Sequence, residues 1–251
     1  MTSKVAPVDV TTLQERVYQE LREALSQGRL TAGESMTIRA LATALGTSEM
    51  PVREALKRLL AERVLVQAPN RTFRIVPMTP SRLHELVQIR VMLEGMAARL
   101  AAAAGSASLV AELTGLNDAM QAALRRADTA GILRAHQAFH FAVYRAAHSP
   151  QLLEIIELLW LRTGPYLAAI FATPGCDPAE LFMGGYKFHA RLIRAVGKRD
   201  AEAAARALEL DLTTAARWCL RHRVVTEPDA EPRAGTQNGA RPATRGNRRA
   251  A

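Results

Sequence analysis

The sequence predicts a mostly α protein, in which an N-terminal winged helix-turn-helix with a small β-hairpin precedes a C-terminal all-α helical bundle. Two short helical patterns joined by about four residues occupy 38–60, and two β-prone runs follow them. From Leu83 to about His222, almost every segment repeats apolar residues at helical spacing. The expected division is a flexible N-terminus at 1–12, a winged helix at 13–78, an all-α unit at 79–223 and a disordered basic tail at 224–251.

The opening segment predicts the first helix of the winged unit. Leu13, Val17, Leu21 and Leu25 recur at near four-residue spacing, which indicates a helix from about 13 to 27 that stops at Gly28. We expect a loop at 28–35, leading into the helix-turn-helix.

The segment 38–60 has the pattern of a helix-turn-helix. Ile38, Leu41 and Leu45 form a helical apolar row that ends at Gly46. A second helix then starts with Ser48 as its N-cap and buries four apolar residues: Val52, Ala55, Leu56 and Leu59. Three cations are left to project outward: Arg53, Lys57 and Arg58. This arrangement is typical of a recognition helix for the DNA major groove, and an ordinary helical hairpin with a solvated charged face is the alternative.

The hairpin of the winged helix is expected from the runs Val64–Val66 and Phe73–Val76. Its tip can touch a phosphate or enter the minor groove. Arg71 and Arg74 are placed for that contact, although a surface arginine on a hairpin is usually only solvated.

Composition agrees with a polyanionic partner without requiring one. Lys plus Arg number 33 against 24 for Asp plus Glu, a net charge of +9 that would also suit any basic protein. Cys176 and Cys219 form no disulfide framework, and no secretory signal is recognisable, so a reducing cytoplasm is the expected location. The Ala-rich run Ala97–Ala104 is too short to cross a bilayer, and we expect no membrane role.

The bundle should follow a hinge at Pro77–Ser81. Its helices are expected near 81–104, 108–125, 129–147, 150–172, 178–196 and 200–222, with a break at Gly164–Pro165. From Val224 onward the chain is rich in Pro, Gly, Thr, Asn and Arg and cannot bury enough apolar surface to order itself. The arginines of this tail add either non-specific attraction to DNA or only solubility.

The apolar rows of the bundle contain four residues that can bind a metal. His136 and His140 lie one turn apart on one row, and later helices place His189 and Asp211 inward. Isolated ionisable groups are costly in an apolar core, so these must either form a hydrogen-bonded core or bind a divalent ion. Nitrogen-rich ligation with an open position favours Zn²⁺, whereas Mn²⁺, Ni²⁺ or Fe²⁺ suits a larger coordination number.

Arg90 also occupies an apolar row and needs an anion. Glu94, four residues on, is one candidate partner. The alternative is that Arg90 holds the carboxylate of a small acid whose other oxygens reach the metal, which would make the bundle a sensor.

The N-terminal part resembles the GntR family of bacterial transcription regulators, and the bundle resembles the FCD type of its FadR branch. The first resemblance rests on 28–34, 41–48, 51–56 and Asn70-Arg71; the second rests on 90–94, Phe139-His140, and His189 followed by 200–204. The family implies a homodimer that binds an inverted-repeat operator in double-stranded DNA, usually as a repressor, and responds to a metabolite in the helical domain.

The resemblance also implies roles for individual residues. Arg39, Ser48 and Arg53 would contact DNA, with Arg71 at the wing, and Lys57 lies on the same recognition helix. Glu49 stands where a basic or neutral residue is usual, so it either accepts from a cytosine amino group or repels phosphate.

Two further departures from the family pattern affect the wing and the metal site. Arg63 and Thr72 replace glycines and leave the geometry of the wing open. Many FCD domains bind metal through an Asp, a His four residues later and two more His. Here His136 stands for that Asp and Asp211 for the last His, so the inventory of three His and one Asp is kept with two positions exchanged.

The expected function is a bacterial, cytoplasmic, nucleoid-associated DNA-binding regulator that is not an enzyme. Its operator affinity would depend on a small carboxylate metabolite bound at the metal site, with Arg90 as an effector contact. The alternative is a helical-bundle metalloenzyme acting on small acids, with the winged helix as an interaction module. Against it, no convincing nucleophile or general base accompanies the four candidate ligands.

Overall fold

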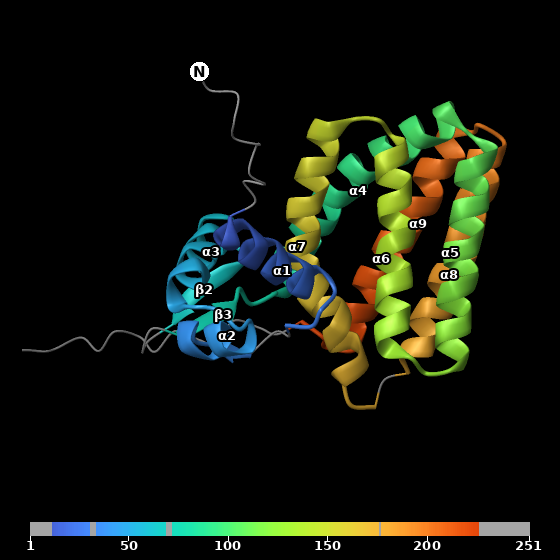
Figure 1. Cartoon of the computed structure of the whole chain (residues 1–251). Coiled ribbons are helices and arrows are strands. Elements are labelled where there is room, and N and C mark those ends of the chain that lie inside the picture. The colour runs from blue at the N-terminus through green and yellow to red at the C-terminus, as the bar shows by residue number, and fades with distance from the viewer. Residues whose placement is uncertain (1–11, 31–33, 69–71, 176, 226–251) are drawn as a thin grey trace, which may run out of the picture.

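A computed structural model describes residues 12–30, 34–68, 72–175 and 177–225, and it places a small winged helix beside a long helical bundle (Figure 1). The winged helix contains α1 (Leu13–Ser26), α2 (Ile38–Ala44), α3 (Glu49–Ala61) and a three-stranded sheet. The bundle follows with α4 (Pro80–Ala104), α5 (Ala107–Arg125), α6 (Thr129–Ala146), α7 (Pro150–Ala172), α8 (Pro178–Gly197) and α9 (Ala201–Arg221). The mostly α fold class is confirmed.

Local capping explains where the helices of the helix-turn-helix begin and end. The Thr37 hydroxyl accepts from the Ala40 amide at the start of α2, and Gly46 follows its end with a left-handed φ of 62°. Ser48 occupies the N-cap position of α3, as predicted, but its side chain makes no capping hydrogen bond. Its hydroxyl is exposed at the surface instead.

The predicted hairpin is present, and it gains a third strand that was not expected. β2 (Leu65–Ala68) and β3 (Thr72–Ile75) pair antiparallel, and β1 (Ser35–Met36) pairs with the other edge of β3. The prediction of a loop through Ser35 was wrong because β1 is only two residues long, too short to show an alternating pattern. Met36 is buried opposite Phe73, which gives the strand its packing.

The predicted break at Gly164–Pro165 is absent, because α7 runs through both residues. Proline removes one amide donor, but tertiary packing can retain a helix around it. Here Gly164, Pro165 and Tyr166 are all buried. A Cβ at Gly164 would lie 2.4 Å from the Leu25 carbonyl oxygen of α1, so the glycine permits close approach of the two helices.

Helix α7 is long and apolar enough to cross a membrane, with a mean hydropathy of 1.3 over its best window. Half of that window is buried in the protein, and α7 packs against α1, α4 and α6. Its Arg162 donates to the Glu62 carbonyl of the winged helix at 2.9 Å. The apolar character of α7 is therefore explained by its packing in the core of the protein.

The two parts of the chain are joined by specific contacts as well as by the linker. A Cβ added at Gly28 would lie 2.4 Å from the Ala168 Cβ of α7. The Tyr166 hydroxyl donates to the Val76 carbonyl oxygen at 2.5 Å, directly after β3. The Val76 amide in turn donates to the Val64 carbonyl at 3.0 Å. A hydrogen-bonded path therefore connects α7 to the base of the wing, on the side of the bundle that faces the winged helix (Figure 1).

Arg63 should carry a measurable conformational cost. It follows α3 with a left-handed φ of 56°, a conformation that disfavours side chains with a Cβ. We expect Arg63→Gly to raise the free energy of unfolding by about 0.5–1 kcal/mol relative to Arg63→Ala, measured by thermal and urea denaturation. Equal stabilities of the two variants would show that the backbone is not strained there.

Candidate functional site

The exposed side of α3 carries the candidate contacts to DNA. Arg53 lies 3.7 Å from Glu49, one turn before it, and Lys57 lies 2.8 Å from Glu54. Arg39 is exposed on α2, beside this surface. A hollow between α2, α3 and the sheet is lined partly by five polar residues: Thr37, Glu49, Arg53, Lys57 and Gln67. Glu49 can therefore compete with a phosphate or base for Arg53, although an exposed pair at this distance is weak.

Two other predicted contacts have different outcomes. Arg58 is exposed, as expected, and it also lies 3.5 Å from the centre of the Tyr18 ring and pairs with Glu15 of α1 at 2.6 Å. The cation therefore contributes to the packing of α1 on α3. Arg71 lies outside the described residues, and the neighbouring Arg74 donates to Ser35 of β1 at 3.0 Å.

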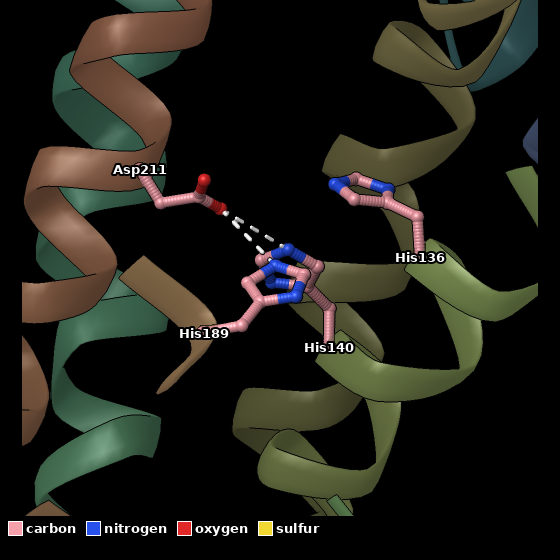
Figure 2. A group of neighbouring side chains, drawn as sticks. All are labelled: His136, His140, His189 and Asp211. Atoms are coloured by element: carbon pink, nitrogen blue, oxygen red, sulfur yellow. Dashed lines mark ion pairs between the residues drawn. The ribbon is translucent and has the colours of Figure 1, made fainter. Parts of the chain in front are cut away.

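The four candidate metal ligands meet inside the bundle, on three helices. Figure 2 shows His136 and His140 on α6, His189 on α8 and Asp211 on α9. One ligand atom from each can be chosen so that all lie within 4.8 Å of one another. Asp211 Oδ2 lies 3.3 Å from His140 Nε2 and 3.7 Å from His189 Nε2, without hydrogen-bonding geometry in either contact.

Hydrogen bonds behind the cluster orient two of the imidazoles. His189 Nδ1 lies 3.1 Å from Asn117 Oδ1, an atom that only accepts, so Nδ1 carries the proton and Nε2 has a free lone pair. His140 Nδ1 lies 3.0 Å from the Tyr144 hydroxyl, which itself donates to Glu94. The tyrosine oxygen therefore accepts from His140, and both Nε2 lone pairs face the cluster.

The electrostatics of the site favour neutral imidazoles around a carboxylate. Burial, reinforced by the neighbouring imidazoles, lowers the pKa of His136 well below its ordinary value, and burial also lowers that of His189. Neutral imidazole and ionised carboxylate are the forms that bind a divalent metal.

The residues present fit a metal ion. His136 Nδ1, His140 Nε2 and His189 Nε2 are buried and have no hydrogen-bond partner among the described residues, which is costly without a further ligand. Tetrahedral zinc bonds of about 2.1 Å would separate ligand atoms by about 3.4 Å. Small side-chain rotations would bring the cluster to that spacing.

Arg90 pairs with Glu94, the partner expected from the sequence, and it also lies near the candidate metal ligands. Its Nε donates to Glu94 Oε1 at 2.6 Å, and its Nη2 to Oε2 at 3.4 Å. Its guanidinium also lies 5.2 Å from the centre of the Trp160 ring. Glu94 thereby connects Arg90 to Tyr144 and so to His140.

A cavity adjoins the cluster. Its lining includes Arg90, His136 and Asp211 at one end and residues of the linker and of α7, such as Met78 and Tyr166, at the other. About 70 Å³ is open to the centre of a water molecule, enough for on the order of five to seven water-sized groups. Such a space suits a small organic molecule in contact with the metal ligands.

Three functional positions were missed by the sequence interpretation. Asn117 and Tyr144 orient the histidines, and Tyr166 connects the cavity wall to the wing. Asn117 had a detectable signal, because it interrupts an apolar row between Leu113 and Met120. Tyr144 and Tyr166 gave none, since a buried tyrosine in a helix is ordinary core.

A winged helix with an exposed cationic helix, joined to an all-α bundle, is the architecture of a DNA-binding transcriptional regulator. Known families agree: residues 13–75 match "Bacterial regulatory proteins, gntR family", and residues 85–214 match "FCD domain". The chain belongs to the GntR family of transcriptional regulators and carries an FCD domain.

Individual relatives support the same assignment. The chain is 34% identical over 201 residues to the HTH-type transcriptional regulator McbR of Escherichia coli K12, covering 80% of this chain and 88% of that protein. It is 31% identical over 198 residues to a probable D-xylose utilization operon transcriptional repressor of Paenarthrobacter nicotinovorans, covering 79% and 84%. The solved structure of E. coli McbR/YncC superposes with a TM-score of 0.78 at 31% identity, covering 84% of this chain and 99% of that one.

Asn117 should act as a positioning residue for His189. Asn117→Leu keeps the volume but removes the acceptor, so we expect zinc affinity to fall about 10- to 100-fold in a chelator competition. Asn117→Asp keeps an acceptor at the same place and should retain most of the affinity. Unchanged zinc affinity in Asn117→Leu at normal thermal stability would contradict this role.

Proposed function

We propose that the protein is a homodimeric repressor whose operator affinity is controlled by a small carboxylate bound at a divalent metal centre in its FCD domain. The observation that carries this proposal is the pair of unpartnered Nε2 atoms of His140 and His189 beside Asp211, with His136 in the same cluster, next to a cavity that reaches the interdomain linker. The repressor relative supports the direction of regulation.

The winged helix supplies the contact with an inverted-repeat operator in double-stranded DNA. In the proposed complex, α3 enters the major groove from Ser48 onward. Arg53, Lys57 and Arg39 contact phosphates or guanines, and Arg71 contacts the backbone at the wing. Glu49 limits non-specific binding, because it competes with phosphate for Arg53 at 3.7 Å.

A second copy of the chain is expected on the outer face of α4. Ile89, Met92, Met96 and Leu100 are exposed there at successive helical spacings, and Met92 and Met96 are 69% and 50% exposed. Exposed apolar rows of this kind commonly mark an interface. A dimer would present two recognition helices to the two half-sites.

The metal would be held by His136, His140, His189 and Asp211, with Zn²⁺ as the first expectation and Ni²⁺, Mn²⁺ or Fe²⁺ as the others. When bound, it would supply a positive centre for an effector carboxylate. Arg90 lines the same cavity and would orient that carboxylate, while Glu94 fixes the guanidinium in place.

The effector would act on DNA binding through the cavity wall. Met78 and Tyr166 line the cavity, and Tyr166 bonds to Val76 at the base of the wing. Occupation of the cavity would bias the position of the winged helix relative to the bundle.

A bacterial cytoplasmic, nucleoid-associated regulator is the corresponding cellular role. The metalloenzyme alternative is not favoured, because the relatives are transcriptional regulators. We propose that the protein has no catalytic activity of its own. Elemental analysis with ligand-release mass spectrometry tests the central proposal: about one divalent ion per chain with a small acid supports it, and no metal after incubation with zinc overturns it.

Two substitutions should separate DNA binding from metal binding. Arg53→Ala should weaken binding to an operator selected from random DNA by roughly 5- to 150-fold, because a contact to a guanine or phosphate is lost, while zinc content stays normal. His140→Ala should reduce zinc content and abolish the effector response, while the metal-free variant still binds DNA. Loss of DNA binding can be followed by fluorescence anisotropy.

The result that would contradict this assignment is full zinc occupancy in His140→Ala, since the cluster would then not be the metal site. The loss of DNA affinity in Arg53→Ala should be compared with the loss in Lys57→Ala, on the same recognition helix. An equal loss of affinity for every DNA sequence is the signature of a phosphate contact.

Tyr166 should transmit the effector signal without being required for metal binding. Tyr166→Phe removes only the hydroxyl that donates to Val76. We expect zinc affinity to be kept. The change in operator binding free energy caused by the acid that mass spectrometry identifies should become smaller by about 0.5–2 kcal/mol. An unchanged effector response would show that the signal leaves the cavity by another route.

A further inference from the structure

The cavity has a direction that follows from the helices around it. On α4, Leu83 lies seven residues before Arg90; on α9, Cys219 lies eight residues after Asp211; and all four line the cavity. At 1.5 Å per residue, these separations correspond to about 10–12 Å along the helices. The cavity therefore extends roughly that far from the metal ligands toward the linker.

The far part of the cavity is apolar. On α8, Gly185 and Leu181 lie one and two turns from His189, away from the cluster. The side chains that line this part come from the linker and three helices, α4, α5 and α8: Met78, Leu83, Val87, Met120, Leu181 and Phe182. A Cβ at Gly185 would lie 3.4 Å from Asp211 Oδ1, so this residue of α8 lies directly beside the cluster.

The polar groups in this lining are already engaged. The Thr163 hydroxyl donates within α7, to the carbonyls of Leu159 at 3.3 Å and Trp160 at 3.2 Å. The Tyr166 hydroxyl donates to Val76. The Cys219 thiol is buried, which raises its pKa to about 12, so it is neutral and a weak donor.

A second charge on the ligand would have no partner at the far end. Within the described lining, Arg90 is the cation, and it lies at the cluster end, where Glu94 already holds two of its donors. A distal carboxylate would be buried without compensation, and the several hydroxyls of a sugar acid would meet a mostly apolar lining. The site therefore discriminates against dicarboxylates and disfavours polyhydroxy acids.

We propose that the effector is a monocarboxylate with a short apolar tail of about four to six carbons. This rests on the proposed function, and it adds the chemical class of the ligand. The carboxylate lies at the metal and Arg90, and the tail runs along Leu83 and Leu181 to Met78 at the linker. Tail length then determines whether the ligand reaches the wall that contacts the winged helix.

The test is a chain-length series on the zinc-loaded full-length protein, measured by calorimetry and by operator anisotropy. The probes are acetate, butyrate and hexanoate, with glutarate and gluconate as polar comparisons of similar chain length. Each buried methylene should tighten binding about fourfold until the cavity is full. Hexanoate should therefore bind much more tightly than glutarate or gluconate, and it should change operator affinity more than acetate does.

A variant pair localises the tail. Ala216 lines the cavity on α9, so Ala216→Leu should fill it, removing the gain from butyrate to hexanoate while acetate binding is unchanged. Ala203→Leu is the matched control, because Ala203 is also partly buried on α9 but faces away from the cavity. It should keep the full chain-length dependence.

The outcomes separate this inference from the function on which it rests. Tighter binding of glutarate or gluconate, with an effect on operator affinity, overturns the apolar tail and retains the carboxylate sensor. A chain-length gain that persists in Ala216→Leu also overturns the inference, because the tail would lie elsewhere. If zinc binds but no carboxylate binds or alters operator affinity, both the inference and the proposed effector response fail.

Discussion

The buried pair of Arg90 and Glu94 is the constraint on which the candidate metal site depends. Arg90 is a permanent cation in the bundle interior, and an uncompensated charge there would be severely destabilising. Glu94 neutralises it, and the same carboxylate accepts from Tyr144, which fixes His140. Burial and the nearby Glu94 carboxylate raise the pKa of Tyr144 well above its ordinary value, so this tyrosine stays protonated. A structural ion pair thus determines which nitrogen of a candidate metal ligand faces the site.

The cavity lies between two regions with different chemistry. One end is formed by His136 and Asp211, which belong to the candidate metal cluster. The other end is formed by the linker and by α7, which contacts the winged helix. A ligand that fills the cavity therefore contacts both the metal site and the joint between the two parts of the chain. Coupling between the bundle and the winged helix therefore does not require a long series of side-chain rearrangements between two distant sites.

The sequence predicted the features that depend on local periodicity and missed those that depend on packing. The helices, the hairpin and the convergence of His136 and His189 followed from apolar spacing, because that spacing fixes which side chains point inward. The continuity of α7 through Pro165 did not, since burial on both sides of the helix overrides a local breaker. Asn117 could be suspected from its apolar row, whereas the link from Tyr166 to Val76 depends on how two separate parts dock.

The glycine contacts between α1 and α7 determine whether the winged helix and the bundle can be exchanged independently of each other. Gly28 and Gly164 let the end of α1 lie directly on α7, where any side chain at 164 would meet the Leu25 carbonyl. A chimaera that joins this winged helix to a different bundle at the linker would keep the covalent connection but lose the packing of α1 on α7. Tyr166 would then be held out of reach of Val76. The unit to transplant is the winged helix together with α7, so a functional graft has to be cut across the bundle instead of at the hinge.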